Sequence, residues 1–208
     1  MELFTSPMAC SLAAHITAYE AGIPLQITYV DTRAKTTKDG RDYRAIASNG
    51  YVPALKLDDG TLLNENPSVL QYLADQNPEA GLAPRWTDVR RYEVIDALNF
   101  LGTELHKKVF SPLFAPAMPA EGKAYAKAGA QQTFDALVRR LGDGDHLVGD
   151  RFTIADAYLV AMLNWCPFVG IDLAQWPKLA SYHKLHLARP AVAKAIGVEM
   201  AERARRAA

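Results

Sequence analysis

The sequence predicts a mixed fold, with a small α/β domain followed by a domain made only of helices. Between residues 2 and 76, short apolar runs and helical patterns follow the order strand–helix–strand, connection, strand–strand–helix. Residues 77–86 contain two prolines and a glycine, which is typical of a linker. Beyond residue 86, every periodic segment has helical spacing. We therefore expect an α/β domain at 1–77, a linker at 78–86 and an all-helical domain at 87–208.

The first three elements form a strand–helix–strand unit. A strand is predicted at Glu2–Thr5, and a second at Leu25–Val30, where apolar and polar residues alternate. Between them the pattern becomes helical from Cys10 and ends at Gly22, a good stop signal. The segment Asp31–Asn49 is polar and irregular, and we expect a short helix within it.

A hairpin and a helix complete the first domain. The turn around Gly60 separates the apolar runs Ala54–Leu57 and Leu62–Leu63. The helix that follows is expected to use Asn66 as its N-cap, with Pro67 in its first turn. This element order fits a small mixed sheet with helices on its faces, which is the thioredoxin-like arrangement.

The start of that helix suggests a site for a ligand with both charges. Free N–H groups at a helix N-terminus favour an anion, and Glu65 beside them suits an ammonium group. The α-amino acid end of a peptide carries both groups. The alternative is a hairpin packed on a helix, with Glu65 simply solvated.

The second domain is predicted to be a bundle of helices. Its first helix, Asp88–Lys108, carries an apolar stripe and is broken by the three prolines of Ser111–Pro119. A capping box of sequence Thr-Ile-Ala-Asp is expected to start a central helix. The predicted helices after the break are Glu121–Leu141, Thr153–Trp165, Trp176–Leu187 and Ala191–Arg205.

Composition narrows the class of protein. The chain has 208 residues and a formal net charge of +0, so nothing suggests a nucleic-acid surface. No apolar run is long enough to span a bilayer, and the N-terminus is a poor signal peptide, so we expect no membrane partner and a cytoplasmic protein. Cys10 and Cys166 are far apart and the histidines lack metal spacing, which argues against a disulfide scaffold and a metal site.

Cys10 is the first candidate for chemistry. It follows a strand and a turn and falls at the start of a helix, where the dipole lowers a thiol pKa below its usual value of about 8.5. The alternative is a buried cysteine packed under the sheet. The neighbouring Ser11 could donate a hydrogen bond to a sulfur held there.

A polar stripe on the long helix and one lysine are further candidates. Asn99, Thr103 and His106 are spaced i, i+4, i+7 beside the apolar stripe, so they face either a cleft or water. Lys35 lies in the irregular segment, and it would meet a ligand carboxylate only if that segment folds over the site.

These residues together resemble the bacterial beta class of glutathione S-transferases. The resemblance rests on SPMACSLAAH, Lys35, the tetrapeptide VPAL, LLNENPSVLQYLAD, LNFLGTELHK and FTIADAYL, in the same order and spacing over nearly the whole chain. FTIADAYL is similar to the capping segment of this superfamily and indicates fold. Cys10 with His106 is the more specific signal, because many other classes carry tyrosine or serine near the N-terminus.

The resemblance implies a role for each site residue. Cys10 would lie next to the glutathione sulfur, with catalytic His106 near it, and Lys35 would meet the glycine carboxylate. Val52, before a cis Pro53, would pair its backbone with the cysteinyl part. Further glutathione contacts are implied for Ser11, Glu65, Asn66, Asn99 and Thr103. The family commonly has serine where this chain has Asn66; asparagine can cap a helix and donate to a carboxylate, so we expect binding to survive.

The resemblance also implies the activity and partners. We expect a bacterial detoxification transferase that conjugates the glutathione thiol to small hydrophobic electrophiles, with glutathione as cosubstrate, no metal, and a homodimeric assembly. Thiol–disulfide exchange through Cys10 is a possible second activity. Two alternatives remain: a non-catalytic module that binds hydrophobic ligands or partners on the same fold, and a specialised glutathione-dependent dehalogenase or isomerase. Five residues offer apolar surface for an electrophile or for the core: Phe110, Phe114, Met118, Trp165 and Phe168.

Overall fold

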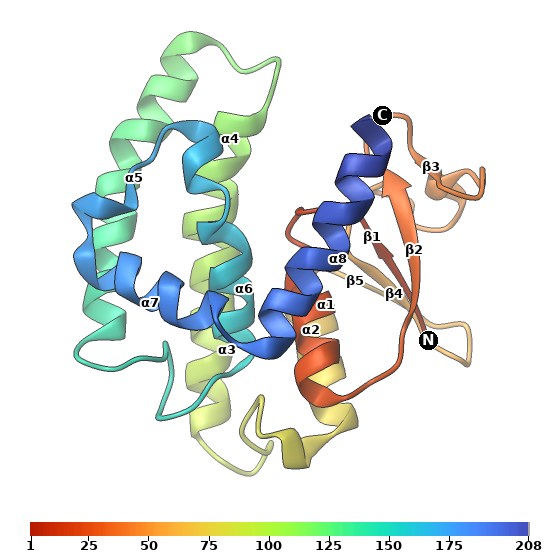
Figure 1. Cartoon of the computed structure of the whole chain (residues 1–208), viewed down its shortest axis with the longest axis horizontal. Coiled ribbons are helices and arrows are strands. Elements are labelled where there is room, and N and C mark those ends of the chain that lie inside the picture. The colour runs from red at the N-terminus through yellow and green to blue at the C-terminus, as the bar shows by residue number, and fades with distance from the viewer. Residues whose placement is uncertain (208) are drawn as a thin grey trace. The chain divides into compact units, whose positions relative to one another are not determined.

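The structure, a computed structural model, describes residues 1–207 and separates into two compact units (Figure 1). The first unit comprises Met1–Ala83 together with Arg189–Ala208, and the second comprises Pro84–Ala188. The segment predicted as the second domain is helical as expected, but its last helix packs on the first unit. Residue 208, where that predicted domain ends, lies outside the described residues.

The first unit is a five-stranded mixed sheet with helices. Its strand order is β3-β2-β1-β4-β5; β1 and β2 are parallel, and the remaining pairs are antiparallel. Its elements are β1 (Glu2–Thr5), α1 (Leu12–Ala21), β2 (Gln26–Asp31), β3 (Thr36–Thr37), β4 (Ala54–Lys56), β5 (Leu62–Asn64), α2 (Asn66–Gln76) and α8 (Pro190–Ala207). The thioredoxin-like βαβ-ββα order is therefore confirmed.

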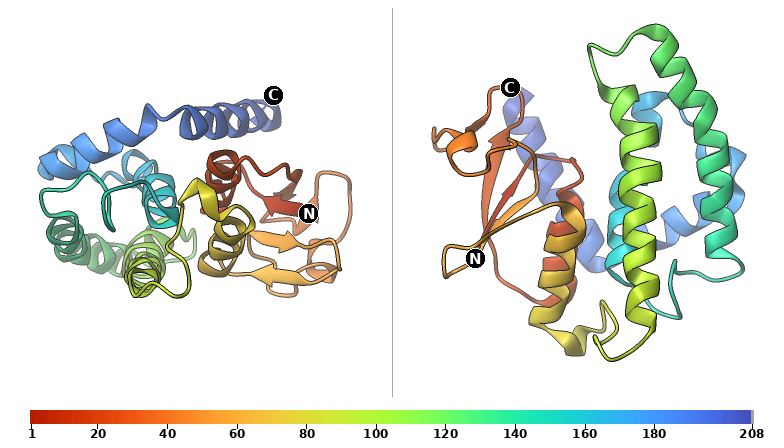
Figure 2. Two further views of the ribbon diagram at one scale, coloured as in Figure 1. Left: turned by 90° about the horizontal axis from the view of Figure 1, so that it is seen from below. Right: turned by 180° about the vertical axis from the view of Figure 1, so that it is seen from behind.

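Each face of the sheet has its own cover. Helices α1 and α2 lie side by side on one face (Figure 2). On the other face, Phe4, Val30 and Ala54 pack against Tyr43 and Ala47 of the connection. The connection contains the short helix we expected, as a 3₁₀ turn at Tyr43–Ala45, and also the strand β3.

Helix α8 runs beside α1 in both Figure 1 and Figure 2. Its buried stripe contains Val192, Ala195, Glu199 and Glu202, which recur at helical spacing. Two of these four are acids, so a purely hydrophobic packing face is not what places this helix.

The second unit is built around one buried helix. Every residue of α6 is buried, and its N-terminus is closed by the predicted capping box of Thr153 and Asp156. The apolar stripe of the first long helix is also fully buried, as its spacing predicts. The helices are α3 (Arg90–Phe100), a π-helix (Leu101–Phe110), α4 (Ser111–Phe114), α5 (Ala120–Leu141), α6 (Ile154–Leu163) and α7 (Pro177–Leu187).

The end of the long helix differs from the prediction. The chain stays helical through Phe114, because Pro112 falls in the first turn of α4, where a missing N–H is tolerated. The break therefore begins at Ala115 rather than at Ser111.

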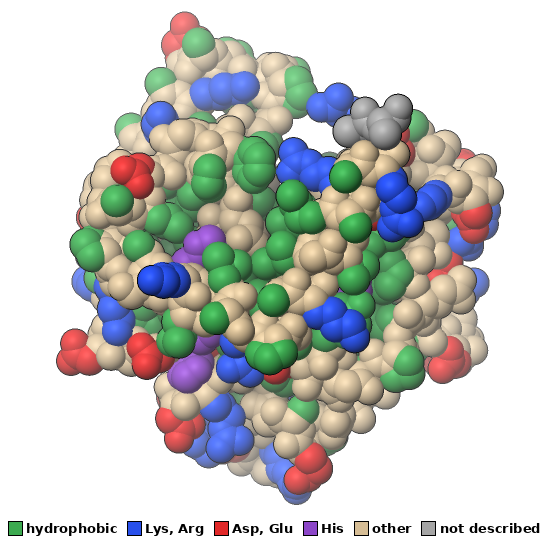
Figure 3. Space-filling model, in the orientation of Figure 1, with side chains coloured by type: hydrophobic (Ala, Val, Ile, Leu, Met, Phe, Trp, Pro, Cys, Tyr) green, Lys and Arg blue, Asp and Glu red, His purple; other side chains and the backbone are tan. Residues whose placement is uncertain are grey.

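Two further features are the distribution of charge on the surface and the character of the helices. Positive and negative side chains are interspersed over the face drawn in Figure 3, in keeping with the formal net charge of +0. Within residues 1–207, no helix combines the length and the apolar character needed to cross a membrane.

Candidate functional site

The loop after β1 carries Cys10. Its thiol lies 3.2 Å from the carbonyl oxygen of Val52, to which it donates, and its side chain is 9% exposed. The bond between Val52 and Pro53 is cis, as the resemblance implied. The structure therefore brings Cys10 and the VPAL tetrapeptide together, although 42 residues separate them in the chain.

Asn66 also reaches the Cys10 loop. Its Nδ2 donates to the carbonyl oxygen of Cys10 at 3.0 Å, and its side chain is buried. The expectation that Asn66 caps the helix is wrong, because α2 begins at Asn66 and the preceding Glu65 takes the N-cap position. The Asn66 Nδ2 group therefore binds the Cys10 loop, 56 residues away in the chain, rather than capping the helix.

Among residues 1–207, three residues other than glycine have a positive φ, and all of them are in the first unit. They are Met8 (φ 61°), Lys35 (φ 58°) and Glu65 (φ 63°). Such conformations cost about 1–3 kcal/mol each and gather at functional sites. Lys35 and Glu65 are predicted ligand contacts, and Met8 is two residues from Cys10.

Lys35 is held beside the tetrapeptide. Its Nζ donates to the carbonyl oxygen of Gly50 at 2.9 Å and lies 5.5 Å from the centre of the Tyr51 ring. The carbonyl that accepts from this ammonium group belongs to Gly50, two residues before Val52 in the chain. The irregular segment folds back toward the site, which is the condition that the sequence left open for this lysine.

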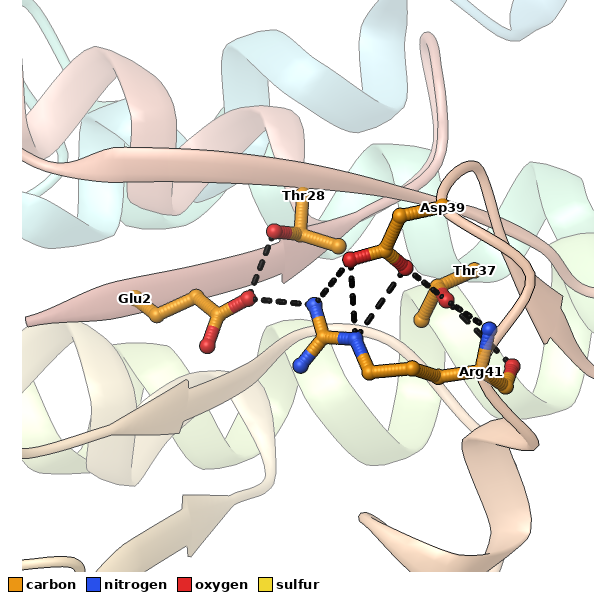
Figure 4. A network of polar contacts seen from close by, with 5 residues as sticks. All are labelled: Glu2, Thr28, Thr37, Asp39 and Arg41. Carbon is orange, nitrogen blue, oxygen red and sulfur yellow. Dashed lines mark hydrogen bonds and ion pairs between the residues drawn. The ribbon is translucent and has the colours of Figure 1, made fainter.

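A polar network fixes the segment that carries Lys35 (Figure 4). Arg41 donates to Glu2 of β1 at 2.8 Å and to both carboxylate oxygens of Asp39, and Thr37 also donates to Asp39. Thr28 of β2 donates to the same Glu2 oxygen at 2.6 Å. The hydrogen bonds from Arg41 and then Thr37 lower the pKa of Asp39 to about 2, so it is ionised at neutral pH.

A second network, buried, fixes the Cys10 loop. Glu199 of α8 accepts from the backbone N–H of Met8 at 2.7 Å, and its other oxygen lies 3.2 Å from His15 Nδ1. Ser11 is fully buried, and its hydroxyl accepts from Thr5 Oγ1 at 2.8 Å and from the Ser6 N–H at 3.2 Å. The Ser11 side chain therefore serves the loop's own hydrogen bonds.

The remaining predicted residues belong to the second unit. Asn99 lies in the last turn of α3, whereas Thr103 and His106 lie in the π-helix Leu101–Phe110. Asn99 and Thr103 are exposed, and Thr103 donates to the Asn99 carbonyl at 3.0 Å. π-Helical stretches are rare and are frequent at functional sites. This departure from a regular α-helix falls on the segment that carries His106.

His106 is a neutral, partly buried imidazole. Burial, and then the charge of Lys107, lower the pKa of its ring from 6.5 to about 4. Its Nδ1 lies 2.8 Å from the hydroxyl of Tyr158, and its ring is 5.2 Å from that of Trp165. At neutral pH the ring therefore has one nitrogen that donates and one that accepts.

Aromatic rings continue from His106. Phe110 is fully buried and Trp165 is 7% exposed, whereas Phe114 and Phe168 are 45% and 60% exposed. The Phe114 and Trp165 rings meet edge to face at 5.6 Å. Of these four aromatic residues, Phe110 and Trp165 form part of the core, whereas Phe114 and Phe168 present apolar surface.

Metal binding and cysteine chemistry are the other two possibilities that the sequence raised. Among the described residues, no three His, Cys, Asp or Glu side chains are grouped to hold a metal ion. Both cysteines are free thiols. Burial raises the pKa of Cys166 to about 12, so its thiolate is disfavoured.

Comparison with known proteins decides the family. The glutathione S-transferase N-terminal domain model matches residues 7–76, and the C-terminal domain model matches residues 104–190. Glutathione S-transferase GstA of Escherichia coli O157:H7 is 41% identical over 96% of this chain and 98% of its own. The chain belongs to the glutathione S-transferase family.

Solved structures of this family agree with that assignment. A sphingomonad glutathione S-transferase complexed with glutathione is 45% identical, with a TM-score of 0.92 over 96% of this chain and 98% of that one. The bacterial beta class glutathione S-transferase of Sphingomonas chungbukensis is 43% identical, with the same TM-score and coverage. The predicted fold and the predicted resemblance to the beta class are confirmed, and the protein is a glutathione transferase.

Sequence reasoning missed two residues of this glutathione S-transferase. Glu199 supports the Cys10 loop, and its signal was an acid on the buried stripe of the last helix. Tyr158 contacts His106, and it lies in the FTIADAYL segment that we read as indicating fold alone. Nothing in the linear spacing of Tyr158 and His106 indicates this contact, because 52 residues separate them.

Proposed function

We propose that this transferase joins the glutathione thiolate to small hydrophobic electrophiles, with Cys10 and His106 as its catalytic residues. The observation that supports this most directly is the contact between the Cys10 thiol and the carbonyl of Val52 before the cis Pro53. That contact sets a thiol against the backbone expected to pair with the cysteinyl part of glutathione. The family assignment supplies the class of reaction.

The charged groups of the first unit suit the two ends of glutathione. Glu65, which is exposed, would accept from the ligand's ammonium group, and the first N–H groups of α2 would hold the adjacent carboxylate. Lys35 would exchange its bond to the Gly50 carbonyl for the glycine carboxylate, a stronger charge-assisted partner. Asn66 would act through its backbone N–H, while its Nδ2 continues to hold the Cys10 carbonyl.

The groups of the second unit suit the sulfur and the electrophile. A neutral His106 would donate to the glutathione thiolate and to charge that develops during transfer. Phe114 and Phe168 present apolar surface for a hydrophobic electrophile. Asn99 and Thr103 are exposed and would complete the polar side, with Asn99 reaching the site of a second subunit.

Calorimetry with reduced glutathione tests the proposal. The wild-type protein should show saturable binding and should conjugate glutathione to an activated aryl halide. In Cys10→Ser, we expect binding to remain, because the Val52, Lys35 and Glu65 contacts persist. Absence of binding in both proteins would reject the proposal, and binding of apolar ligands without turnover would support a non-catalytic module instead.

We also propose thiol–disulfide exchange at Cys10. Its thiolate would attack glutathione disulfide, forming a Cys10–glutathione disulfide and releasing a glutathione thiolate that takes up a proton. Intact mass with glutathione disulfide should show one glutathione adduct, which is lost in Cys10→Ala. Conjugation should persist in that variant if His106 suffices, so equal loss of both activities would reject this division of roles.

We propose further that the protein is a homodimer of the reducing cytoplasm, where its free cysteines would stay thiols. Val89 and Tyr92 are 75% and 63% exposed and line a cavity of about 480 Å³ on the second unit, together with Phe100, Leu137 and Arg140. Exposed apolar surface beside a cavity is typical of an interaction face. Sedimentation at low concentration should give the dimer mass; a monomer would contradict this assignment.

A further inference from the structure

The ring of His106 is held by two neighbours in its own unit. The Tyr158 hydroxyl lies 2.8 Å from Nδ1, with the two rings edge to face at 87°. The Trp165 ring lies 5.2 Å from the imidazole. The aromatic contact with Trp165 and the hydrogen bond at Nδ1 therefore set the orientation of the His106 ring.

Tyr158 is a fixed group, because α6 is fixed. Its side chain is 2% exposed, and every residue of α6 is buried. The fully buried Asp156 accepts from the N–H groups of Leu147 and Thr153 at 2.8 Å each, and from the Tyr182 hydroxyl at 2.7 Å. The helix is thus anchored one half-turn before Tyr158, and the hydroxyl cannot drift without disturbing this anchor.

The direction of the hydrogen bond decides which nitrogen of His106 carries the proton. A neutral imidazole has one N–H donor and one acceptor nitrogen, and the partner of one nitrogen sets the role of the other. A phenol is a more acidic donor than a neutral imidazole N–H, and an imidazole nitrogen is a better acceptor than a phenol oxygen. The O–H···N arrangement is therefore favoured over the reverse.

We propose that Tyr158 is a positioning residue that donates to Nδ1 of His106 and so keeps the ring proton on Nε2. The consequence for transfer rests on the proposed function. Nε2–H is then the ring donor available to a glutathione thiolate. The opposite tautomer would turn a lone pair toward the sulfur and repel its negative charge. Tyr158 thereby determines whether His106 stabilises the thiolate.

Nuclear magnetic resonance of protein labelled with ¹⁵N-histidine tests this without any ligand. The chain has five histidines, so the His106 signals are assigned by their loss in His106→Gln. Long-range ¹H–¹⁵N correlation at neutral pH should show Nδ1 of His106 without a proton and Nε2 with one. A proton on Nδ1 in the wild-type protein would overturn the inference, even if no variant could be prepared.

Tyr158→Phe keeps the ring and removes only the hydroxyl. We expect the Nδ1 signal to move toward that of a mixture of tautomers, and kcat for conjugation to fall about ten-fold, the effect of one lost hydrogen bond in the transition state. The KM for glutathione should change less than about two-fold, because Tyr158 is expected to act on the sulfur rather than on binding. An unchanged His106 spectrum would overturn the inference.

Tyr182→Phe is the matched control. Tyr182 is also 2% exposed and also loses a buried hydrogen bond, but its partner is Asp156 rather than His106. The N–H groups of Leu147 and Thr153 still hold Asp156 in this variant, so the Nδ1 and Nε2 signals of His106 should stay in place. A tautomer change there would mean that the effect is general to the bundle and would overturn the specific role. If the wild-type tautomer is as inferred but glutathione neither binds nor reacts, the inference about Tyr158 stands and the proposed function fails.

Discussion

At the scale of residues, the site is marked by backbone strain that its neighbours hold in place. Met8, Lys35 and Glu65 adopt left-handed conformations that favour glycine. Glu199 holds the N–H of Met8, the Gly50 carbonyl holds the Lys35 ammonium, and the carbonyl of Glu65 accepts from Val69 at 3.1 Å. Each strained residue therefore has a partner that fixes it, as expected where geometry serves ligand binding.

Glu199 is the partner whose removal is easiest to interpret. Glu199→Gln keeps the shape of the side chain but removes the charge that faces Met8 and His15 in a fully buried setting. We expect the free energy of unfolding to fall by about 1–3 kcal/mol, because hydrogen bonds to a buried carboxylate are lost or weakened. Amide exchange at Met8 should become faster, and the KM for glutathione should rise.

An exposed acid supplies the control for this substitution. Glu121→Gln, on the exposed side of α5, should change the free energy of unfolding by less than about 0.5 kcal/mol. If Glu199→Gln also changes the free energy of unfolding by less than about 0.5 kcal/mol, and if the Met8 amide exchanges as slowly as before, then the carboxylate does not hold the Cys10 loop.

At the scale of elements, apolar spacing correctly predicted where the helices and most strands lie. It did not predict the backbone hydrogen-bond pattern of a helix or the function of an element. The stripe Val94, Leu98, Leu101 and Leu105 is buried as expected. The same spacing does not distinguish the α-helix from the π-helix that follows it, because both bury one face of the segment. Strand β3 has two residues and no apolar alternation, so local pattern carries no signal for it.

The candidate site was predictable where a residue acts by its type and local position. Cys10, Lys35 and Glu65 are of this kind, and the structure gives each a local geometry that suits its proposed role. Asn66 and Tyr158 act through partners more than 50 residues away, and tertiary packing alone creates those contacts. The predicted cap was wrong because α2 begins one residue earlier than expected, with Asn66 inside its first turn and Glu65 at the N-cap position.

At the scale of the whole molecule, chain order and packing disagree for the last helix. Helix α8 follows the helical domain in sequence but belongs to the first unit by its contacts. Polar contacts add to its buried apolar residues there: Glu202 accepts from Lys38 at 2.9 Å, and Arg189, just before the helix, donates twice to Glu20. An amphipathic pattern reveals a buried face but not the surface that covers it, so sequence alone assigned α8 to its neighbours in the chain.

The acid stability of the whole protein should depend on two histidines of the second unit. Burial, and then neighbouring positive charge, lower the pKa of both His106 and His183 from 6.5 to about 4. Between pH 6.5 and 4 the unfolded chain therefore binds protons that the folded chain does not. The free energy of unfolding is therefore greatest above pH 6.5 and falls as the pH is lowered through this window.

Urea unfolding at pH 7, 6 and 5 measures this effect before most carboxylates titrate. Each histidine should contribute a loss of about 1–2 kcal/mol from pH 7 to pH 5, after allowance for its partial exposure. The three tryptophans, Trp86, Trp165 and Trp176, all lie in the same unit as both histidines, so their fluorescence reports the relevant transition.

His183→Gln separates the two contributions. The variant loses the bond between Nε2 and Asn164 Oδ1, which is 2.9 Å long, so its stability at pH 7 should be lower. The decrease in its free energy of unfolding from pH 7 to pH 5 should nevertheless be about half that of the wild type, because only His106 then titrates in this way. Stability that is flat between pH 7 and pH 5, or that rises on acidification, would show that these rings are not held neutral by burial. The neutral His106 that the proposed transfer requires would then have to be maintained by the ligand instead.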